Sequence, residues 1–162
     1  MKLYHGTNIQ FEIPKIIIPN RALDFGVGFY TTSDRNQAEN WAKIVVKRQN
    51  NGTAILNIYE FESANLKHLN IKQFENPTKE WLDFICEHRL ENYKGENFDL
   101  IIGAVANDDT IQVIHDYMRA KDKNLYAPIA LSEIKPENLT DQYVFKTELA
   151  LSFLKLIEIK VL

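Results

Sequence analysis

The sequence predicts a single α+β domain, and three features lead to this prediction. Short strand-like and helix-like segments follow one another without the regular β-α-β alternation that is typical of a doubly wound parallel sheet. The chain has 162 residues, of which 45% are hydrophobic, so it can bury a self-sufficient core without disulfides or a structural metal. Its five prolines are scattered and no internal repeat stands out, so residues 1–162 are expected to form one domain.

The N-terminal part of the chain predicts two short strands, a helix and a longer strand. Residues 2–5 and 29–32 are strand candidates, because aromatic and β-branched residues lie there beside glycines. Ser33 is a suitable N-cap for a helix over residues 34–47. Residues 53–62 carry apolar side chains on both alternating faces, which indicates a strand partly buried on either side. The apolar stripe expected on the helix consists of Ala38, Trp41, Ala42 and Val45.

The C-terminal part predicts further short elements in mixed order. Asn76 and Pro77 are the expected cap and first residue of a helix that extends to about Asn92, and residues 98–102 are a short apolar strand. A helix over residues 108–119 is expected to turn Ile111, Ile114, His115 and Met118 to one side. The remaining expected elements are a weaker helix over 125–134 interrupted by Pro128, a strand over 142–145, a short helix over 147–154 and a final strand over 155–162.

Charge and cysteine usage narrow the possible functions. With 19 Lys and Arg against 22 Asp and Glu, the net charge of −3 gives no general basic field for nucleic acid, although a local site stays open. The single cysteine, Cys86, is expected in the core and fits a reducing cytoplasm. The N-terminus lacks the pattern of a signal peptide, and no apolar run approaches the ~20 residues of a membrane span, so no membrane partner is expected. His68, His88 and His115 share no metal-ligand spacing, so we expect no metal.

Three segments carry candidate functional residues. In the first, a strand leads through His5 into Gly6, whose missing side chain would let a ligand reach the backbone. In the second, glycines precede Tyr30, and the helix that bears Trp41 follows. The third is the polar start of a late strand at Gln142. Taken singly, each of these residues is also compatible with an ordinary structural role.

In this order, over about 140 residues, the segments resemble the ADP-ribosyltransferase superfamily, in its diphtheria-toxin and poly(ADP-ribose) polymerase branch with a His, Tyr, Glu triad. His5-Gly6-Thr7 matches the His-Gly-Ser or His-Gly-Thr strand of that branch, and Trp41 lies at the spacing of its second aromatic residue. Phe25-Gly26-Val27-Gly28-Phe29-Tyr30 matches Phe-Gly-x-Gly-x-Tyr. Nearly the whole chain, including residues 103–108, is also similar to an uncharacterised bacterial family of that superfamily, whose members are suspected toxins of toxin–antitoxin pairs.

The resemblance implies a split β-sheet core flanked by helices that binds NAD as the donor of ADP-ribose. Gly6 would offer its backbone N–H and C=O to the nicotinamide carboxamide, with a further hydrogen bond from Thr7. His5 would donate a hydrogen bond to the adenosine ribose. The nicotinamide ring would lie between Tyr30 and Trp41, and Gly28 belongs to the same implied set of cofactor-binding residues. The acceptor would be a macromolecule, either protein or nucleic acid, and an antitoxin protein is a further possible partner.

Gln142 is the departure from the family pattern, because Gln142-Tyr143-Val144-Phe145 stands where that branch has Glu-Tyr-x-x-Tyr. With His5 and Tyr30, Gln142 completes the expected catalytic set. Its amide keeps a hydrogen bond to a ribose hydroxyl but loses the negative charge, and it cannot act as a general base. The position two residues earlier is Thr140, which disfavours an arginine target by the same comparison.

A replacement base could come from one of several aspartates, or be unnecessary if the target is itself a good nucleophile. The candidates are Asp24, Asp108 and Asp109, although Asp108 and Asp109 also suit the cap of the following helix. Asp141 is a poorer candidate, since neighbours on a strand point to opposite faces. Two rival functions stay open: a catalytically weak or inactive NAD-binding or ADP-ribose-binding module that acts through protein interaction, and a pure protein-interaction domain.

Overall fold

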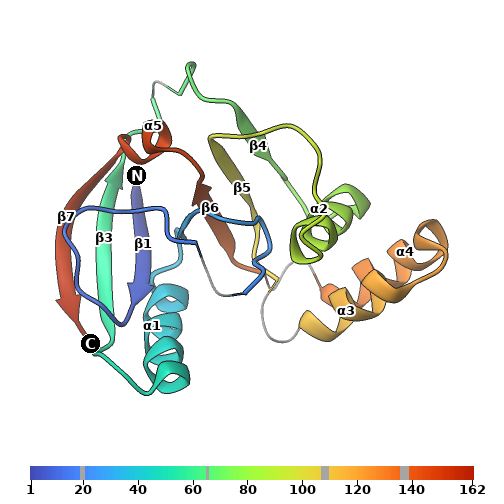
Figure 1. The fold of residues 1–162 in the computed structure, drawn as a ribbon, viewed down its shortest axis with the longest axis horizontal. Helices are drawn as coiled ribbons and strands as arrows, with labels where there is room; N and C mark the ends of the chain where they lie inside the picture. The colour runs from blue at the N-terminus through green and yellow to red at the C-terminus, as the bar shows by residue number, and fades with distance from the viewer. Residues whose placement is uncertain (19–20, 65, 107–109, 136–138) are drawn as a thin grey trace.

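Two open β-sheets lie side by side in the computed structural model, which describes residues 1–18, 21–64, 66–106, 110–135 and 139–162 (Figure 1). The first, sheet A, is antiparallel and has the order β1 (Lys2–Thr7), β3 (Ile55–Phe61), β7 (Leu154–Val161). The second, sheet B, has the order β2 (Phe29–Thr31), β6 (Asp141–Phe145), β5 (Leu100–Ala104), β4 (Ile71–Gln73), with only β4 and β5 parallel. The α+β prediction is therefore confirmed.

Five helices flank these sheets in the described residues: α1 (Arg35–Gln49), α2 (Lys79–Arg89), α3 (Ile111–Arg119), α4 (Lys123–Ile134) and α5 (Glu148–Leu151). Helix α1 packs on sheet A, whereas α2, α3 and α4 gather beside sheet B (Figure 1). None of the helices in the described ranges is long and apolar enough to cross a membrane.

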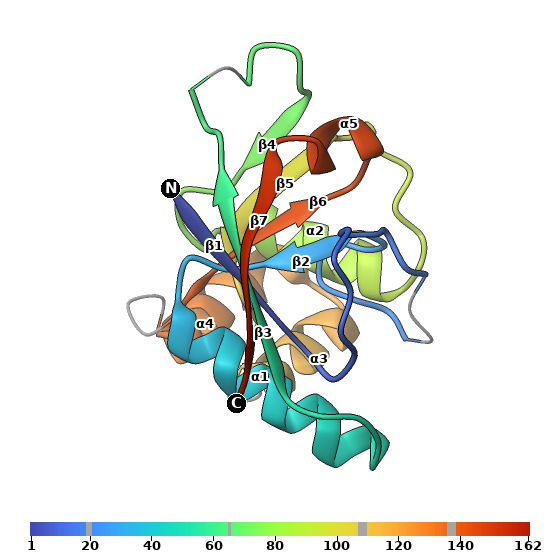
Figure 2. The same ribbon diagram turned by 90° about the vertical axis from the view of Figure 1, so that its left-hand side faces the viewer.

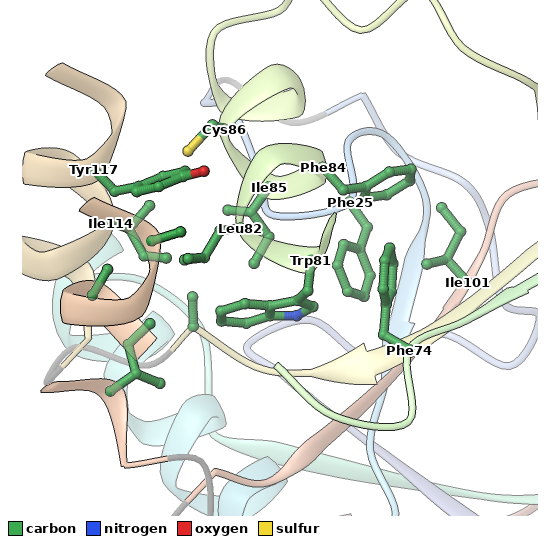
Figure 3. Packing of buried hydrophobic residues seen from close by; sticks show 14 of the residues in the cluster. Phe25, Phe74, Trp81, Leu82, Phe84, Ile85, Cys86, Ile101, Ile114 and Tyr117 are labelled. Carbon is green, nitrogen blue, oxygen red and sulfur yellow. The ribbon is translucent and has the colours of Figure 1, made fainter. Parts of the chain in front are cut away.

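The largest apolar cluster lies between sheet B and helices α2 to α4. Figure 3 shows its centre, where the Trp81 indole lies below Leu82 and Ile85 and beside the rings of Phe25 and Phe74. Cys86, expected in the core, is fully buried here. A second cluster includes Leu3 of sheet A and Phe145 of sheet B, so apolar packing connects the two sheets.

Several element boundaries differ from the sequence predictions because capping side chains decide them. Asp34, not Ser33, caps α1, since its carboxylate accepts a hydrogen bond from the Gln37 N–H. Thr78, not Asn76, caps α2 in the same way. Helix α4 starts earlier than expected and continues through the exposed Pro128.

Three further expectations are corrected by the structure. In α3, Tyr117 rather than His115 points into the core, while His115 is exposed. Trp41 does not belong to the buried stripe of α1, where only Ala38 and Ala42 are buried. Strand β4 is not among the expected elements, because three residues are too few to show a periodic pattern. The expected start of the α3 helix at residue 108 lies outside the described residues.

Candidate functional site

Backbone hydrogen bonds join the two sheets at the pair formed by Tyr4 of β1 and Thr32, the residue directly after β2. The Tyr4 N–H donates to the Thr32 carbonyl at 2.8 Å, and the Thr32 N–H donates to the Tyr4 carbonyl at 3.0 Å. An antiparallel ladder continued from this pair would place Gly6 opposite Tyr30. Instead, His5 donates from Nδ1 to the Tyr30 carbonyl at 2.6 Å, so a side chain occupies the place of the next ladder bond.

Gly6 presents its backbone polar groups to this split between the sheets. Met1 and Phe61 exchange backbone hydrogen bonds, which makes them a hydrogen-bonded pair of the β1–β3 ladder. Because such pairs alternate along a strand, His5 turns its N–H and C=O toward β3, whereas Tyr4 and Gly6 turn theirs to the opposite edge. Within the described part of the chain, no hydrogen bond to the Gly6 N–H or C=O is found. Gly6 thus leaves one donor and one acceptor at the split.

The missing side chain of Gly6 serves the packing of α1. A Cβ atom at this position would lie 2.0 Å from the Ala38 carbonyl oxygen and 2.9 Å from the Ala42 nitrogen. This differs from the expectation that the glycine leaves room for a ligand, because helix backbone fills that room. Gly6 is itself buried, so helix α1 closes its face, and what it leaves without a hydrogen-bond partner in the described residues is its backbone N–H and C=O. Thr7, next along the strand, accepts a hydrogen bond from the Ile9 N–H at 3.3 Å and keeps its hydroxyl hydrogen for another partner.

His5 is held as a neutral imidazole with a defined tautomer. A carbonyl oxygen only accepts, so the hydrogen of the ring must be on Nδ1, which leaves Nε2 as an acceptor. Burial lowers the pKa of His5 to about 4, and the hydrogen bond to Tyr30 opposes that shift only in part. The ring stacks on Phe29 with 4.4 Å between centroids and contacts Phe11 at 5.6 Å. His5 therefore offers an acceptor, whereas the resemblance implies a donor.

The Tyr30 hydroxyl closes the turn that precedes β2. It donates to the Gly26 carbonyl at 2.7 Å and accepts from the Phe25 N–H at 3.2 Å. Gly26 has φ of 71°, a left-handed conformation that glycine adopts without strain. Burial, and secondarily the charge of Asp24, raises the pKa of Tyr30. The hydroxyl is thus engaged, and the partly buried ring packs against the apolar cluster between sheet B and helices α2 to α4.

Gly28 and Trp41 lie in different surroundings from those expected. A Cβ on Gly28 would meet Val144 Cγ1 at 2.5 Å, so the missing side chain of this glycine allows β6 to pack closely and does not make room for a ligand.

The Trp41 side chain on α1 is 37% exposed, and the guanidinium carbons of Arg21 and Arg48 lie 5.4 and 5.3 Å from its ring centroid. Such distances allow cation–π attraction. Arg21 and Arg48 are neighbours of Trp41 that sequence reasoning did not single out in this role.

Gln142 lies on the same face of sheet B as Tyr30. Tyr30 pairs with Val144, two residues along β6, so the side chains of Tyr30 and Gln142 are diagonal neighbours. Gln142 is only 4% exposed, and its Nε2 donates to the Ala104 carbonyl of β5 at 3.1 Å. Its Oε1 makes no hydrogen bond with a described residue. The amide is therefore anchored by its nitrogen and keeps an oxygen acceptor.

The candidate general bases are engaged in structural contacts. Arg89 of α2 donates from Nε to Asp24 Oδ1 at 2.8 Å, and the Ala106 N–H donates to Oδ2 at 3.1 Å, so Asp24 is a buried counter-ion. Asp141 accepts from the Ser33 N–H at 2.7 Å and from the Thr32 hydroxyl at 3.0 Å, which joins β6 to the start of α1. Asp108 and Asp109 lie outside the described residues.

Sequence reasoning missed two residues near the site, the half-buried Arg89 and the fully buried Asn57. Sequence reasoning could not identify Arg89, because nothing in its local pattern indicates that it pairs with Asp24, 65 residues earlier. Asn57 lies opposite His5 in the β1–β3 ladder and is fully buried, yet neither polar atom of its amide forms a regular hydrogen bond with a described residue. In the sequence, Asn57 stands out only as a polar residue in a mostly apolar strand. An ordinary strand with one solvent-facing side would show the same pattern, so the sequence does not indicate that Asn57 is buried.

Two surface hollows lie away from these residues. One of about 430 Å³ is on α2, and one of about 440 Å³ lies between α3 and α4; their lining residues do not include His5, Gly6, Tyr30 or Gln142. Phe11 contacts the His5 ring, so the segment between β1 and β2 covers this residue. No group of three or more His, Cys, Asp or Glu side chains in the described ranges is placed to hold a metal ion.

Over residues 1–156 the chain matches the model of a family described as a protein of unknown function, DUF3990. Comparison with curated proteins and with solved structures finds no match. The matched range includes His5, Tyr30 and Gln142, and therefore all parts of the junction between the two sheets.

Proposed function

Since the chain belongs to the DUF3990 family, which is described only as being of unknown function, we propose a function from its geometry: an NAD-dependent ADP-ribosyltransferase with a macromolecular target. The target is a protein or a nucleic acid. The two open sheets then correspond to the split-sheet core of that superfamily. By the same resemblance, the protein acts in the cytoplasm as the toxin of a toxin–antitoxin pair.

The observation that carries this proposal is the unpaired edge of Gly6 at the split between the sheets. A carboxamide has one C=O and one NH₂ group side by side, so it can accept from the Gly6 N–H and donate to the Gly6 C=O. These are the hydrogen bonds that the ladder with Tyr30 would otherwise supply. Nicotinamide carries such a group. The Thr7 hydroxyl is next along the strand and can add a further hydrogen bond.

Polar and aromatic groups around Gly6 suit the rest of the donor. Neither His5 Nε2 nor Gln142 Oε1 has a hydrogen-bond partner among the described residues, so each is proposed to accept from a ribose hydroxyl. The rings of Tyr30 and Trp41 would flank the cationic pyridinium, each contact contributing roughly 0.5–2 kcal/mol. Entry of a dinucleotide requires the segment that carries Phe11 to move off His5.

The proposed reaction breaks the bond between the anomeric carbon and nicotinamide, whose nitrogen takes the bonding electrons. The acceptor then forms a bond to that carbon and releases its proton to solvent, since Asp24 is already paired with Arg89. The chain contributes mainly positioning and electrostatic stabilisation. Because Gln142 has no charge, it stabilises the cationic transition state less than a glutamate would, by about 3 kcal/mol or a hundredfold in rate.

The test measures NAD binding by titration calorimetry and nicotinamide release on incubation. In His5→Asn, the amide can keep the bond to the Tyr30 carbonyl while the Nε2 acceptor is lost, so NAD should bind about tenfold more weakly without unfolding. His115→Asn, on the exposed side of α3, is the matched control. Absence of NAD binding by the wild type at millimolar concentration, with unchanged behaviour of Tyr30→Ala, would contradict the proposal.

A second candidate function, an NAD-binding module without transfer, is favoured by the anchoring of Gln142. Its amide nitrogen donates to the Ala104 carbonyl, a bond that a carboxylate cannot make. The substitution Gln142→Glu separates the two functions. Turnover that arises only in this variant supports the module, whereas loss of an existing wild-type activity in this variant eliminates it.

A further inference from the structure

Strand β7 forms an open edge of sheet A. It has eight residues and, in the described part of the chain, pairs on one side only, with β3. Figure 2 views the sheet from the side of β7, with α1 on one face and the loop over residues 8–18 on the other. An unpaired edge of this length offers a row of backbone N–H and C=O groups that a further strand can satisfy.

The pairing of β7 with β3 fixes which residues face that open edge. The Leu162 N–H donates to the Ala54 carbonyl at 2.9 Å. Because every second residue of an antiparallel strand points its N–H and C=O to the same neighbour, residues 160 and 158 also turn theirs toward β3. Ile159 and Val161 therefore turn their N–H and C=O groups outward. A strand added to this edge must take its hydrogen bonds from these two residues.

The side chains of this segment are divided between the two faces of the sheet. Glu158 and Lys160 are exposed on the face of α1, where they interact electrostatically with Arg35 and Glu39. Val161 is 62% exposed and, with Ile159, belongs to the opposite, apolar face, while Ile157 at the bulge is 45% exposed. The added strand must therefore be apolar on one face and charged on the other.

We propose that this strand is β7 of a second copy of the chain, antiparallel, with the two Ile159 residues opposite each other on a twofold axis. Glu158 of each copy then faces Lys160 of the other, and Ile157 faces Val161. Only outward-facing residues can pair through hydrogen bonds, so the two strands can shift only in steps that keep such residues opposite each other. The next register in one direction places Glu158 opposite Glu158, and the next in the other direction places Lys160 opposite Lys160. Opposite charges across a ladder stabilise the pair and like charges destabilise it, so charge selects this register.

The register limits the paired segment to residues 157–161. The ladder of β7 with β3 shifts between Ile58 and Tyr59, which leaves Ile157 as the extra residue of a bulge. Lys155 lies beyond this bulge, so a change of its charge should not affect the pair. The interface is self-complementary, as a twofold dimer requires.

Sedimentation equilibrium of the full chain tests the proposal. We expect a reversible dimer whose dissociation constant rises about tenfold or more in Glu158→Lys and in Lys160→Glu, because each change sets like charges opposite each other. An equal mixture of these two variants should restore the wild-type affinity as a heterodimer, since every cross-strand pair is again of opposite sign. Lys155→Glu is the matched control and should dimerise like the wild type.

Circular dichroism of each variant shows whether it is folded, and the mixture is informative even if the single variants differ slightly in stability. A wild type that stays monomeric up to about 100 µM overturns the proposal. The β7 edge would then pair, if at all, with a strand of a different protein. Equal dimerisation of the wild type and both charge variants, or a mixture that stays monomeric, also overturns it.

Discussion

The His5 imidazole donates from Nδ1 to the Tyr30 carbonyl at 2.6 Å, where the ladder between the two sheets would otherwise continue. This bond lets the sheets separate directly after the Tyr4–Thr32 pair without leaving the Tyr30 carbonyl unsatisfied. It also fixes the tautomer of the ring and leaves the Gly6 edge unpaired. His5 therefore has a structural role at the junction, and the Gly6 backbone groups beside it have no hydrogen-bond partner in the described residues.

Burial of neutral His5 should make stability depend on pH. The pKa of His5 is lowered to about 4 in the folded chain, below the ordinary value of 6.5, so the unfolded chain binds the extra proton first. Its contribution to the free energy of unfolding is complete above about pH 6.5 and falls by roughly 2–3 kcal/mol as the pH drops to 4. Denaturant unfolding at several pH values measures this.

His5→Asn provides the comparison for that prediction, because it removes the titrating group and can keep the bond to Tyr30. The difference in stability between wild type and variant should change over this pH range, whereas effects of carboxylates cancel. His88, whose pKa is also lowered by burial, is unchanged in both proteins. A difference that is constant from pH 7 to 4 would show that His5 titrates normally.

Gly6→Ala should destabilise the fold strongly, because the new Cβ would overlap the Ala38 carbonyl of α1. We expect the free energy of unfolding to fall by about 2–4 kcal/mol, as for other overpacked positions. Gly95→Ala is the comparison: the nearest atoms to its Cβ belong to the Tyr93 side chain and not to helix backbone, so we expect a smaller loss. Equal stability of the two variants in urea would refute the role of Gly6 in the packing of α1.

Tyr30→Phe should loosen the turn before β2 while it keeps the aromatic ring. The lost hydroxyl donates to the Gly26 carbonyl and accepts from the Phe25 N–H, so we expect a loss of about 1–2 kcal/mol in thermal or chemical unfolding. Tyr126→Phe, on α4, removes a hydroxyl for which no hydrogen bond to a described residue is found. If both variants unfold alike, the Tyr30 hydroxyl does not hold the turn.

Asp24→Asn should cost far more than the loss of an exposed ion pair. Asp24 and Arg89 have side chains only 9% and 17% exposed, so the change leaves a guanidinium with little access to water. The expected loss is about 3 kcal/mol. Glu80→Gln breaks the exposed pair with Lys72 and should cost less than about 1 kcal/mol. Unfolding midpoints that shift equally would contradict the buried character of the first pair.

Tryptophan fluorescence can report whether Trp41 contacts the proposed donor. The chain has two tryptophans, and Trp81 is fully buried with its Nε1 donating to the Ala104 carbonyl at 3.2 Å. Addition of NAD should therefore quench mainly the exposed Trp41, and Trp41→Phe should abolish most of the change. The same quenching in this variant would place the ligand away from Trp41.

Local patterns predicted much of the fold. The alternation over residues 53–62 corresponds to β3, which is buried on both faces, and the stripe around Ala38 and Ala42 corresponds to the inner side of α1. These predictions succeed because periodicity and helix caps depend on residues that are close in sequence. The three motifs and their order were recognised from the sequence alone, and the proposal that the chain binds NAD rests on that resemblance.

Tertiary structure alone decided what the motif residues touch. Gly6 is small because α1 crosses it, His5 offers an acceptor because Tyr30 takes its hydrogen, and Asp141 joins β6 to Thr32 across 109 positions. Such contacts depend on how two sheets meet, and no local propensity encodes them. The sequence by itself thus determined most of the elements and the candidate residues, while packing determined which of their polar atoms have a hydrogen-bond partner.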